Sequence, residues 1–264
     1  MVAKRIIPCL DVKEGRTVKG INFVGLQDVG DPVELGAYYS ACGADELVYL
    51  DISATREGRG TFTELVRKIS GRINIPFTVG GGISSLDDAS RLLDAGADKI
   101  SINSSAIANP SLIDAIAGKY GNQFVVVAID ARRVDNGCGA GINSGDGASR
   151  WMATTHGGSK PTDKELFRWA LEAQERGAGE ILFTSMDHDG TRAGYPCKTF
   201  ARLSEVISIP VIASGGAGSA ADIADVLSRG RADAALAASI FHYGEIGIRE
   251  LKEELLAQGI EVRL

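Results

Sequence analysis

Histidine and cysteine are scarce in this sequence, and their scarcity argues against several kinds of site. The 264 residues include three histidines and four cysteines, and none of them shows zinc-ligand spacing or a C-x-x-C pair. A disulfide framework and a metal centre are therefore not expected. The sequence also lacks the Gly-Lys-Ser/Thr of a P-loop and the dinucleotide-binding fingerprint. We expect no metal and no cofactor.

Basic runs and long apolar runs are missing as well. The net charge is −6, from 28 basic and 34 acidic residues, and no run of five basic residues occurs. Nucleic acid and membrane surfaces are therefore poor candidates as partners. The first residues lead directly into a strand pattern, with no signal peptide and no membrane-spanning segment. A cytoplasmic location is expected.

The chain does contain short apolar runs that alternate with helical patterns. The runs are rich in Val, Ile, Leu and Ala, which is typical of strands buried on both faces of a parallel sheet. With no Pro/Ser-rich linker, 264 residues suit one α/β domain, a (β/α)8 TIM barrel, better than two domains or an open sheet. The strands are predicted at residues 5–10, 46–51, 77–79, 99–102, 124–130, 180–185, 211–213 and 234–237.

Several helices have recognisable start signals. A capping residue before proline, or a serine followed three residues later by an acidic residue, is typical of a helix N-terminus. These signals occur at Asp31-Pro32, at Asn109-Pro110 and at Ser85 with Asp88, and a final amphipathic helix is predicted over residues 246–258.

Internal repetition divides the chain into two similar halves. Residues 43–46 (GADE) are echoed by 177–180 (GAGE), and residues 96–98 (GAD) by 230–233 (GRAD). The distance between copies is too long for a solenoid unit. The repeat predicts a barrel built from two homologous half-barrels. Their predicted spans are about residues 1–122 and 123–264.

Asp11 and Asp130 are the strongest catalytic candidates. Each follows a hydrophobic strand directly, and barrel enzymes carry their chemistry at the C-terminal ends of the strands. These strands, the first and fifth, face each other across the barrel mouth, so the two carboxylates can serve as an acid and a base. The alternative is that each carboxylate only caps its own loop.

Two glycine-rich loops predict anion binding. Residues 80–82 and 214–218 each lead to a helix start, and polar strand ends follow at 103–104 and 238–239. Glycine lets the backbone approach a phosphate, and the helix N-terminus supplies amides. Tight turns would explain one such cluster, whereas matching clusters in both halves indicate a substrate with two phosphates.

Three further segments are interpreted as loops near the predicted site. Arg16 and Lys19 lie in what reads as a long loop after the first strand, which could fold over a substrate or remain solvated. Asp189-Gly190 is interpreted as part of a loop near the second phosphate, and not as a metal cluster. Residues 136–149 are Gly/Ser-rich and predict a mobile loop after the fifth strand.

Four charged residues begin strands at the opposite end of the barrel. The side chains of Arg5, Glu46, Lys99 and Glu180 can converge there, and their two positive and two negative charges nearly cancel. From the residues alone, this set reads as a salt-bridged plug that stabilises the barrel floor.

The sequence resembles the cyclase subunits of imidazole glycerol phosphate synthase, a family of histidine biosynthesis. The resemblance covers essentially the whole chain. The segments that carry it are residues 4–12 (KRIIPCLDV), 16–20 (RTVKG), 30–34 (GDPVE), 77–83 (FTVGGGI), 155–158 (THGG), 213–218 (ASGGAG) and 237–242 (AASIFH).

The resemblance implies a reaction and assigns roles to the candidates. Ammonia from a glutaminase subunit, docked at the N-terminal barrel face, would convert phosphoribulosyl-formimino-aminoimidazole carboxamide ribonucleotide to imidazole glycerol phosphate and aminoimidazole carboxamide ribotide. Asp11 and Asp130 would be the acid–base pair, assisted by Lys19, and the charged ring would be an ammonia gate. The implied substrate and phosphate ligands are Gly81, Gly82, Asn103, Ser104, Thr184, Asp189, Gly190, Ser214, Gly215, Gly216, Ala238 and Ser239.

Two departures and two rival functions remain. The family usually has an aspartate where this chain has Pro196, and the segment 136–149 is longer than the resemblance implies. The sugar isomerase of the same pathway is also a duplicated barrel with two opposed carboxylates, but it needs neither ammonia nor a partner. A non-catalytic or redesigned barrel that retains phosphate binding is the other alternative.

Overall fold

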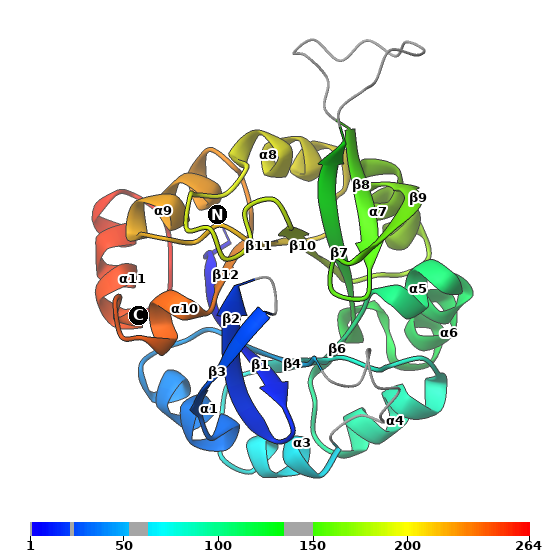
Figure 1. The fold of residues 1–264 in the computed structure, drawn as a ribbon, viewed down its shortest axis with the longest axis horizontal. Helices are drawn as coiled ribbons and strands as arrows, with labels where there is room; N and C mark the ends of the chain where they lie inside the picture. The colour runs from blue at the N-terminus through cyan, green and yellow to red at the C-terminus, as the bar shows by residue number, and fades with distance from the viewer. Residues whose placement is uncertain (1, 22–23, 53–62, 135–149) are drawn as a thin grey trace.

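A closed ring of parallel strands forms the centre of the molecule (Figure 1). The computed structural model describes residues 2–21, 24–52, 63–134 and 150–264. In this described part, eight parallel strands pair in sequence around the ring, and the pairing of β7 with β10 closes it. The (β/α)8 barrel prediction is confirmed. The strands are β1 (Arg5–Lys13), β4 (Leu47–Asp51), β5 (Phe77–Gly80), β6 (Lys99–Ile102), β7 (Val125–Val134), β10 (Glu180–Ser185), β11 (Val211–Ser214) and β12 (Ala234–Ala237).

Helices surround the strand ring and bury the outer face of each strand (Figure 1). A smaller apolar cluster, which includes Ile7, Val48 and Val126, fills the inside of the barrel. The strands are therefore buried on both faces, which explains their continuous apolar sequences. The helices are α1 (Pro32–Ala41), α3 (Thr63–Ser70), α4 (Leu86–Asp94), α5 (Ser104–Ala108), α6 (Ser111–Tyr120), α7 (Leu166–Glu175), α8 (Cys197–Val206), α9 (Ala220–Ser228), α10 (Ser239–His242) and α11 (Ile248–Ala257), with the 3-10 helix η1 (Asn122–Phe124).

The prediction of a long loop after the first strand is wrong. The chain forms a hairpin there, in which β2 (Arg16–Ile21) pairs antiparallel with β1 and with β3 (Val24–Gly30). Glu14 and Gly15 connect β1 to β2 with φ angles of 51° and 77°. Two successive positive φ angles match the right-handed twist of a hairpin, so this two-residue turn keeps the strands paired.

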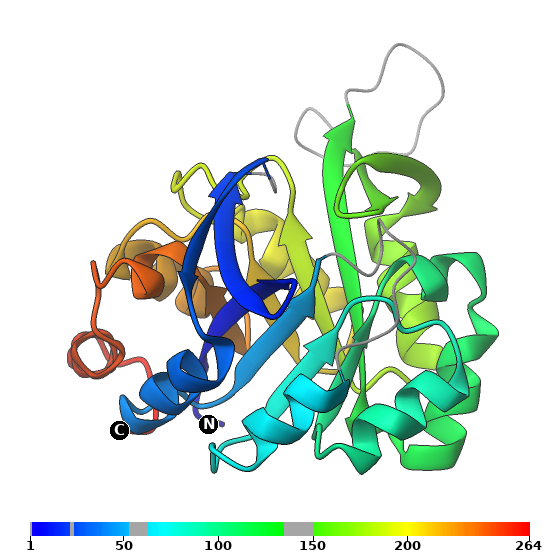
Figure 2. The same cartoon turned by 60° about the horizontal axis from the view of Figure 1, so that its bottom comes forward.

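A second hairpin follows β7. The fifth strand continues past Asp130 to Val134 and pairs antiparallel with β8 (Arg150–Thr155), which pairs with β9 (Lys160–Glu165). Figure 2 shows both hairpins on the side of the barrel toward which the parallel strands run. The predicted mobile loop at 136–149 lies outside the described residues.

The helix start signals are confirmed in two of three cases. Asp31 caps α1 through Val33 and Glu34, and Ser85 with Asp88 forms a complete capping box on α4. The third prediction is wrong: Pro110 is the cap residue of α6, and no side-chain cap hydrogen bond forms. The last helix begins at Ile248, two residues later than predicted.

Each half of the chain contains a further repeat. A Gly-Ala-Asp or related sequence precedes β4, β6, β10 and β12, so it marks every second strand of the barrel. In three of the four copies, the aspartate accepts a backbone N–H from the start of the neighbouring strand. These contacts are Asp45 with Ile6 at 2.7 Å, Asp98 with Phe77 at 3.0 Å and Asp233 with Val211 at 2.9 Å. The proposed division near residue 122 stays a prediction.

Pro196, the departure from the family pattern, stands at the start of α8. It is the cap residue, and its carbonyl accepts the backbone N–H groups of Thr199 and Phe200 at 2.9 and 3.2 Å. The helix therefore begins without the side-chain cap that an aspartate could supply. The preceding residue is still fixed, because the Tyr195 hydroxyl donates to the Leu236 carbonyl of β12 at 3.0 Å.

The buried Asp45–Lys252 pair predicts that Asp45→Ala lowers the free energy of unfolding more than Asp233→Ala does. Their side chains are 3% and 2% exposed, and Lys252 Nζ lies 2.9 Å from the Asp45 carboxylate. Asp45→Ala is expected to lower the free energy of unfolding by about 3–5 kcal/mol, because it leaves a buried ammonium without its partner. Asp233→Ala removes the same kind of backbone contact from a carboxylate that is 44% exposed, and about 1 kcal/mol is expected. Urea unfolding measures both values, and equal losses would contradict the prediction.

Candidate active site

A cavity of about 540 Å³ opens at the C-terminal ends of the barrel strands. All residues predicted for catalysis and for substrate or phosphate binding line it, although they come from both halves of the chain. They are Asp11, Lys19, Gly81, Gly82, Asn103, Ser104, Asp130, Thr184, Asp189, Gly190, Ser214, Gly215, Gly216, Ala238 and Ser239. The structure thus brings the candidates together, while their individual roles stay predictions.

Asp11 forms an ion pair with Lys19. Antiparallel pairing of β1 with β2 places Asp11 opposite Val18. Lys19, the residue after Val18, therefore lies close to Asp11. Lys19 Nζ lies 3.2 Å from Asp11 Oδ2, and the Asp11 side chain is only 6% exposed. The contact fixes the Asp11 carboxyl group in the cavity next to a positive charge.

The pKa of Lys19 lies above its ordinary value. Burial is the largest influence and lowers this pKa, but the negative charges of Asp11 and Asp189 raise it by more. The ammonium therefore stays charged at neutral pH. A fixed positive charge in a mostly buried position can stabilise negative charge that develops on a bound substrate.

Asp130 has the opposite surroundings. Burial raises the pKa of Asp130 to about 7, and the negative charge of Asp189 adds to the effect. Hydrogen bonds from Thr184 and Asn103 work against the rise. A carboxyl group with this pKa carries a proton in a large fraction of molecules at neutral pH, so it can act as an acid. The two aspartates therefore have different environments, one beside an ammonium and one buried with a raised pKa.

Asn103 contacts Asp130, which differs from its predicted role as a phosphate ligand. Its Nδ2 donates to Asp130 Oδ2 at 3.0 Å. Within the described part of the chain, its Oδ1 is buried and accepts no hydrogen bond. The side chain therefore orients the carboxyl group and keeps one acceptor for a donor that enters the cavity.

Both glycine loops contain two successive glycines with positive φ angles. Gly81 and Gly82 have φ angles of 100° and 67°, and Gly215 and Gly216 have φ angles of 83° and 127°. A Cβ atom on Gly81 would lie 2.2 Å from the Asp51 carbonyl oxygen, and one on Gly216 would lie 2.3 Å from the Gly194 carbonyl oxygen. Glycine is thus required for the chain path, and the open backbone faces the cavity.

His156 and Arg192 are among the cavity residues that were not predicted as site residues. His156 lies in the β8–β9 turn with φ 55°, and its backbone N–H donates to Ser104 Oγ at 3.0 Å. Arg192 has φ 58° and forms two hydrogen bonds, of 2.9 and 2.8 Å, with the exposed Glu245. The His-Gly-Gly turn was visible in the sequence, but its contact with Ser104 follows from the second hairpin.

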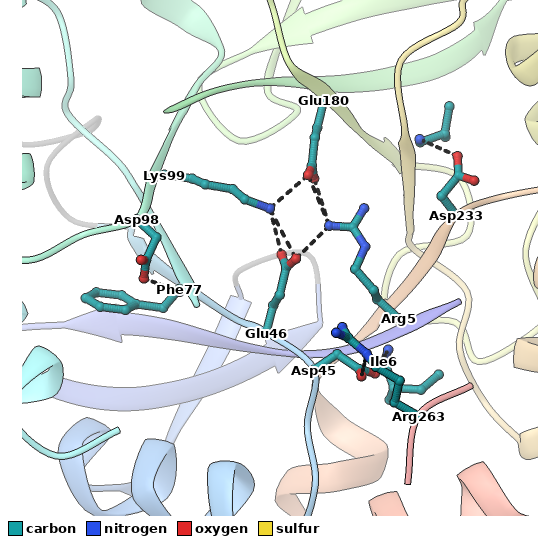
Figure 3. Close-up of polar contacts among 11 residues, drawn as sticks. Arg5, Ile6, Asp45, Glu46, Phe77, Asp98, Lys99, Glu180, Asp233 and Arg263 are labelled. Atoms are coloured by element: carbon teal, nitrogen blue, oxygen red, sulfur yellow. Dashed lines mark hydrogen bonds and ion pairs between the residues drawn. The ribbon is translucent and has the colours of Figure 1, made fainter. Parts of the chain in front are cut away.

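The charged residues at the other end of the barrel form a closed ring (Figure 3). Arg5 lies 2.7 Å from Glu46 and 3.0 Å from Glu180. Lys99 completes the ring at 3.0 and 2.8 Å from the same two carboxylates. The predicted convergence of these four side chains is confirmed. Their side chains are 9–14% exposed, so each charge is balanced by two opposite neighbours.

Two features are absent from the described residues. These residues contain no group of three or more His, Cys, Asp or Glu side chains that could hold a metal ion. No helix within the described ranges is both long and apolar enough to span a membrane.

Comparison with known proteins gives one consistent result. A family model described as histidine biosynthesis protein matches residues 5–247. The imidazole glycerol phosphate synthase subunit HisF of Bacteroides thetaiotaomicron is 60% identical over 263 residues, and that of Flavobacterium johnsoniae is 58% identical over 264 residues. That of Cytophaga hutchinsonii is 58% identical over 263 residues. Each of these alignments covers 100% of both proteins.

The raised pKa of Asp130 predicts how stability depends on pH. Between the ordinary pKa of 3.8 and about 7, the folded state binds a proton that the unfolded state has released. Increasing pH therefore destabilises the parent protein through this group, and Asp130→Asn removes the effect. The stability of the variant relative to the parent should increase across this window, by up to a few kcal/mol, and then level off. Urea unfolding at about pH 5, 6 and 8 tests this, and a falling or flat difference would contradict it.

Proposed function

Because this chain belongs to the histidine biosynthesis protein family, we propose that it is the cyclase subunit of an imidazole glycerol phosphate synthase. Its reaction uses ammonia to convert phosphoribulosyl-formimino-aminoimidazole carboxamide ribonucleotide to imidazole glycerol phosphate and aminoimidazole carboxamide ribotide. The proposal includes a cytoplasmic location. The observation that carries it is a cavity lined by two glycine-rich loops and by two carboxyl groups, one paired with Lys19 and one with a raised pKa.

The chemistry requires protons to move in both directions. Ammonia adds to the ketone of the ribulosyl arm and water departs, which needs a proton donor near the oxygen. The new nitrogen then attacks the formimino carbon, and the C–N bond to the departing aminoimidazole carboxamide ribotide breaks. That leaving nitrogen also takes up a proton, while formation of the imidazole ring releases one. In this proposal, Asp130 donates protons and Asp11, beside Lys19, accepts them.

The matching loops suit the two ends of the substrate. One phosphate contacts Gly82, Ser104 and the start of α5, and the other contacts Gly216, Ser239 and the start of α10. Backbone N–H groups at glycine loops and helix starts bind phosphate without a net positive protein charge. Fixing both ends would hold the reacting centre between the two aspartates, which lie on opposed strands.

The charged ring is proposed to be the entry point for ammonia. A glutaminase subunit docked at the N-terminal face would release ammonia beside Arg5, Glu46, Lys99 and Glu180. Inside the ring, the barrel is lined by apolar side chains such as Ile7, Val48 and Leu182. Neutral ammonia can cross such an interior, whereas an ammonium ion would lose its hydration. The closed ring would then have to open for passage.

The isomerase of the same pathway is the nearest alternative. It also needs two opposed carboxylates and two phosphate sites. The closed ring of four charges favours the cyclase, because an isomerase takes up no ammonia. The comparisons agree, since all of the relatives named above are synthase subunits.

Turnover with ammonium alone tests the proposed reaction. The purified chain, given the bisphosphate substrate and high ammonium without a glutaminase, is expected to deplete the substrate absorbance. Asp11→Asn and Asp130→Asn should each reduce kcat/KM by about 10²-fold or more, because each removes a proton-transfer group. Asp187→Asn is the matched control, since Asp187 lies in the same loop as Asp189 but accepts the Arg133 backbone N–H. No turnover by the parent protein at saturating ammonium would rule out the cyclase.

The gate proposal predicts a change in coupling and not in chemistry. Lys99→Met breaks two contacts of the ring, so ammonia should escape or fail to enter while the cavity stays intact. Ammonium-driven kcat should stay within about twofold of the parent. With a glutaminase partner, the glutamate formed per imidazole glycerol phosphate should rise above one. The control is Lys4→Met, because Lys4 pairs with Asp233 at the same face but lies outside the ring. Equal coupling in both variants would refute the gate.

A further inference from the structure

His242 connects three elements behind the second phosphate loop. It is the last residue of α10, whose first residue is the predicted phosphate ligand Ser239. Its Nε2 lies 3.0 Å from the Cys9 carbonyl oxygen of β1, and its Nδ1 lies 2.6 Å from the Tyr39 hydroxyl of α1. Cys9 precedes Asp11 by two residues, so one imidazole links a proposed phosphate site to a proposed catalytic strand.

The Cys9 carbonyl lies just beyond the last hydrogen-bonded pair of residues between β1 and β12. The Arg5 backbone N–H donates to Asp233 on the β12 side, and the groups of every second residue along a strand point to the same neighbour. The Cys9 carbonyl therefore points toward β12 as well. However, the pairing of β1 with β12 ends at Pro8 with Ala237. The Nε2–H of His242 therefore replaces the backbone N–H that a longer β12 would donate to this carbonyl.

The hydrogen bonds determine the form of the imidazole. A carbonyl oxygen only accepts, so Nε2 must carry the hydrogen, and in a neutral ring Nδ1 then accepts from the Tyr39 hydroxyl. Burial and the positive charge of Lys19 lower the pKa of His242 to about 4, against smaller contributions from Asp11 and the Cys9 carbonyl. The ring is therefore neutral at physiological pH, with a single tautomer set by its partners.

The first half of the barrel has no histidine at the position that corresponds to His242. Ser104 corresponds to Ser239 in the repeat, and three residues later the first half has Ile107 where the second half has His242. An isoleucine side chain cannot donate to a carbonyl. On β7, the Thr154 hydroxyl of β8 donates to the Asp130 carbonyl at 2.9 Å. The strands that carry Asp11 and Asp130 are therefore supported by different contacts.

We propose that His242 is a positioning residue for the cyclase reaction, which holds the phosphate-binding start of α10 in register with Asp11 on β1. The inference rests on the proposed function. Tyr39 supports the link, because its hydroxyl donates to His242 Nδ1. A shift of about 1 Å between a bound substrate and a catalytic group can reduce a rate by about 10²-fold, so the link matters for catalysis as well as for stability.

Ammonium-driven kinetics of four variants test the proposal. His242→Phe keeps a ring but removes both hydrogen bonds, and kcat/KM is expected to fall about 10- to 100-fold, with a higher KM and a lower kcat. His242→Gln can donate to Cys9 and accept from Tyr39, and it should retain kcat/KM within about threefold. Tyr39→Phe should lie between the two. Tyr49→Phe is the matched control, because it removes another buried hydroxyl contact with α1 and should leave kcat/KM unchanged.

Imidazole NMR supplies a readout that does not depend on turnover. With three histidines in the chain, the ring signals can be assigned by substitution. His242 is expected to be neutral with the hydrogen on Nε2 at pH 7, and Tyr39→Phe should shift its Nδ1 signal. A charged ring, the other tautomer, or a His242→Phe variant with parental kcat/KM would each overturn the proposal. A parent protein that shows no turnover would instead refute the proposed function, whatever the NMR result.

Discussion

The alternation of side chains along closed parallel strands is the constraint on which the rest of this structure depends. Along β1, every second residue points into the barrel, from Arg5 in the ring through Ile7 and Cys9 to Asp11 in the cavity. β10 repeats the order from Glu180 through Leu182 to Thr184. A register shift of one residue would turn all of these side chains toward the helices. One geometric rule therefore places the charges, the apolar interior and the cavity residues together.

The duplicated barrel becomes chemically useful because its halves differ where the reaction needs a difference. Lys19 from the β2 hairpin contacts Asp11, whereas Asn103 contacts Asp130. Asp189 acts on both sides, since its charge raises the pKa of Asp130 and also that of Lys19. Similar loops suit two similar phosphates, while unequal neighbours would let two identical carboxyl groups take the proposed separate roles of acid and base.

Strands, cavity residues and the charged ring could be predicted from the sequence because they depend on short-range patterns and on one repeat. The hairpin of β1 and β2 was missed, since a Glu-Gly turn with two positive φ angles gives a weaker signal than Asn-Gly. The Asn103 contact was missed because it joins residues 27 positions apart through the pairing of β6 with β7. Arg192 was missed because its place in the cavity follows from the path of a loop that contains no periodic pattern.

The two ends of the barrel solve opposite electrostatic problems. At the ring, four charged side chains are mostly buried, and each contacts two partners of opposite charge, so the ring is closed. Between the ring and the cavity, apolar side chains leave no partner for a charge, which would admit ammonia in its neutral form. In the cavity, the Lys19 ammonium sits beside Asp11, and Asp130, the proposed proton donor, is across the barrel. Ammonia that arrives neutral is already nucleophilic, so in the proposed reaction the two aspartates would serve the leaving groups and the closing ring.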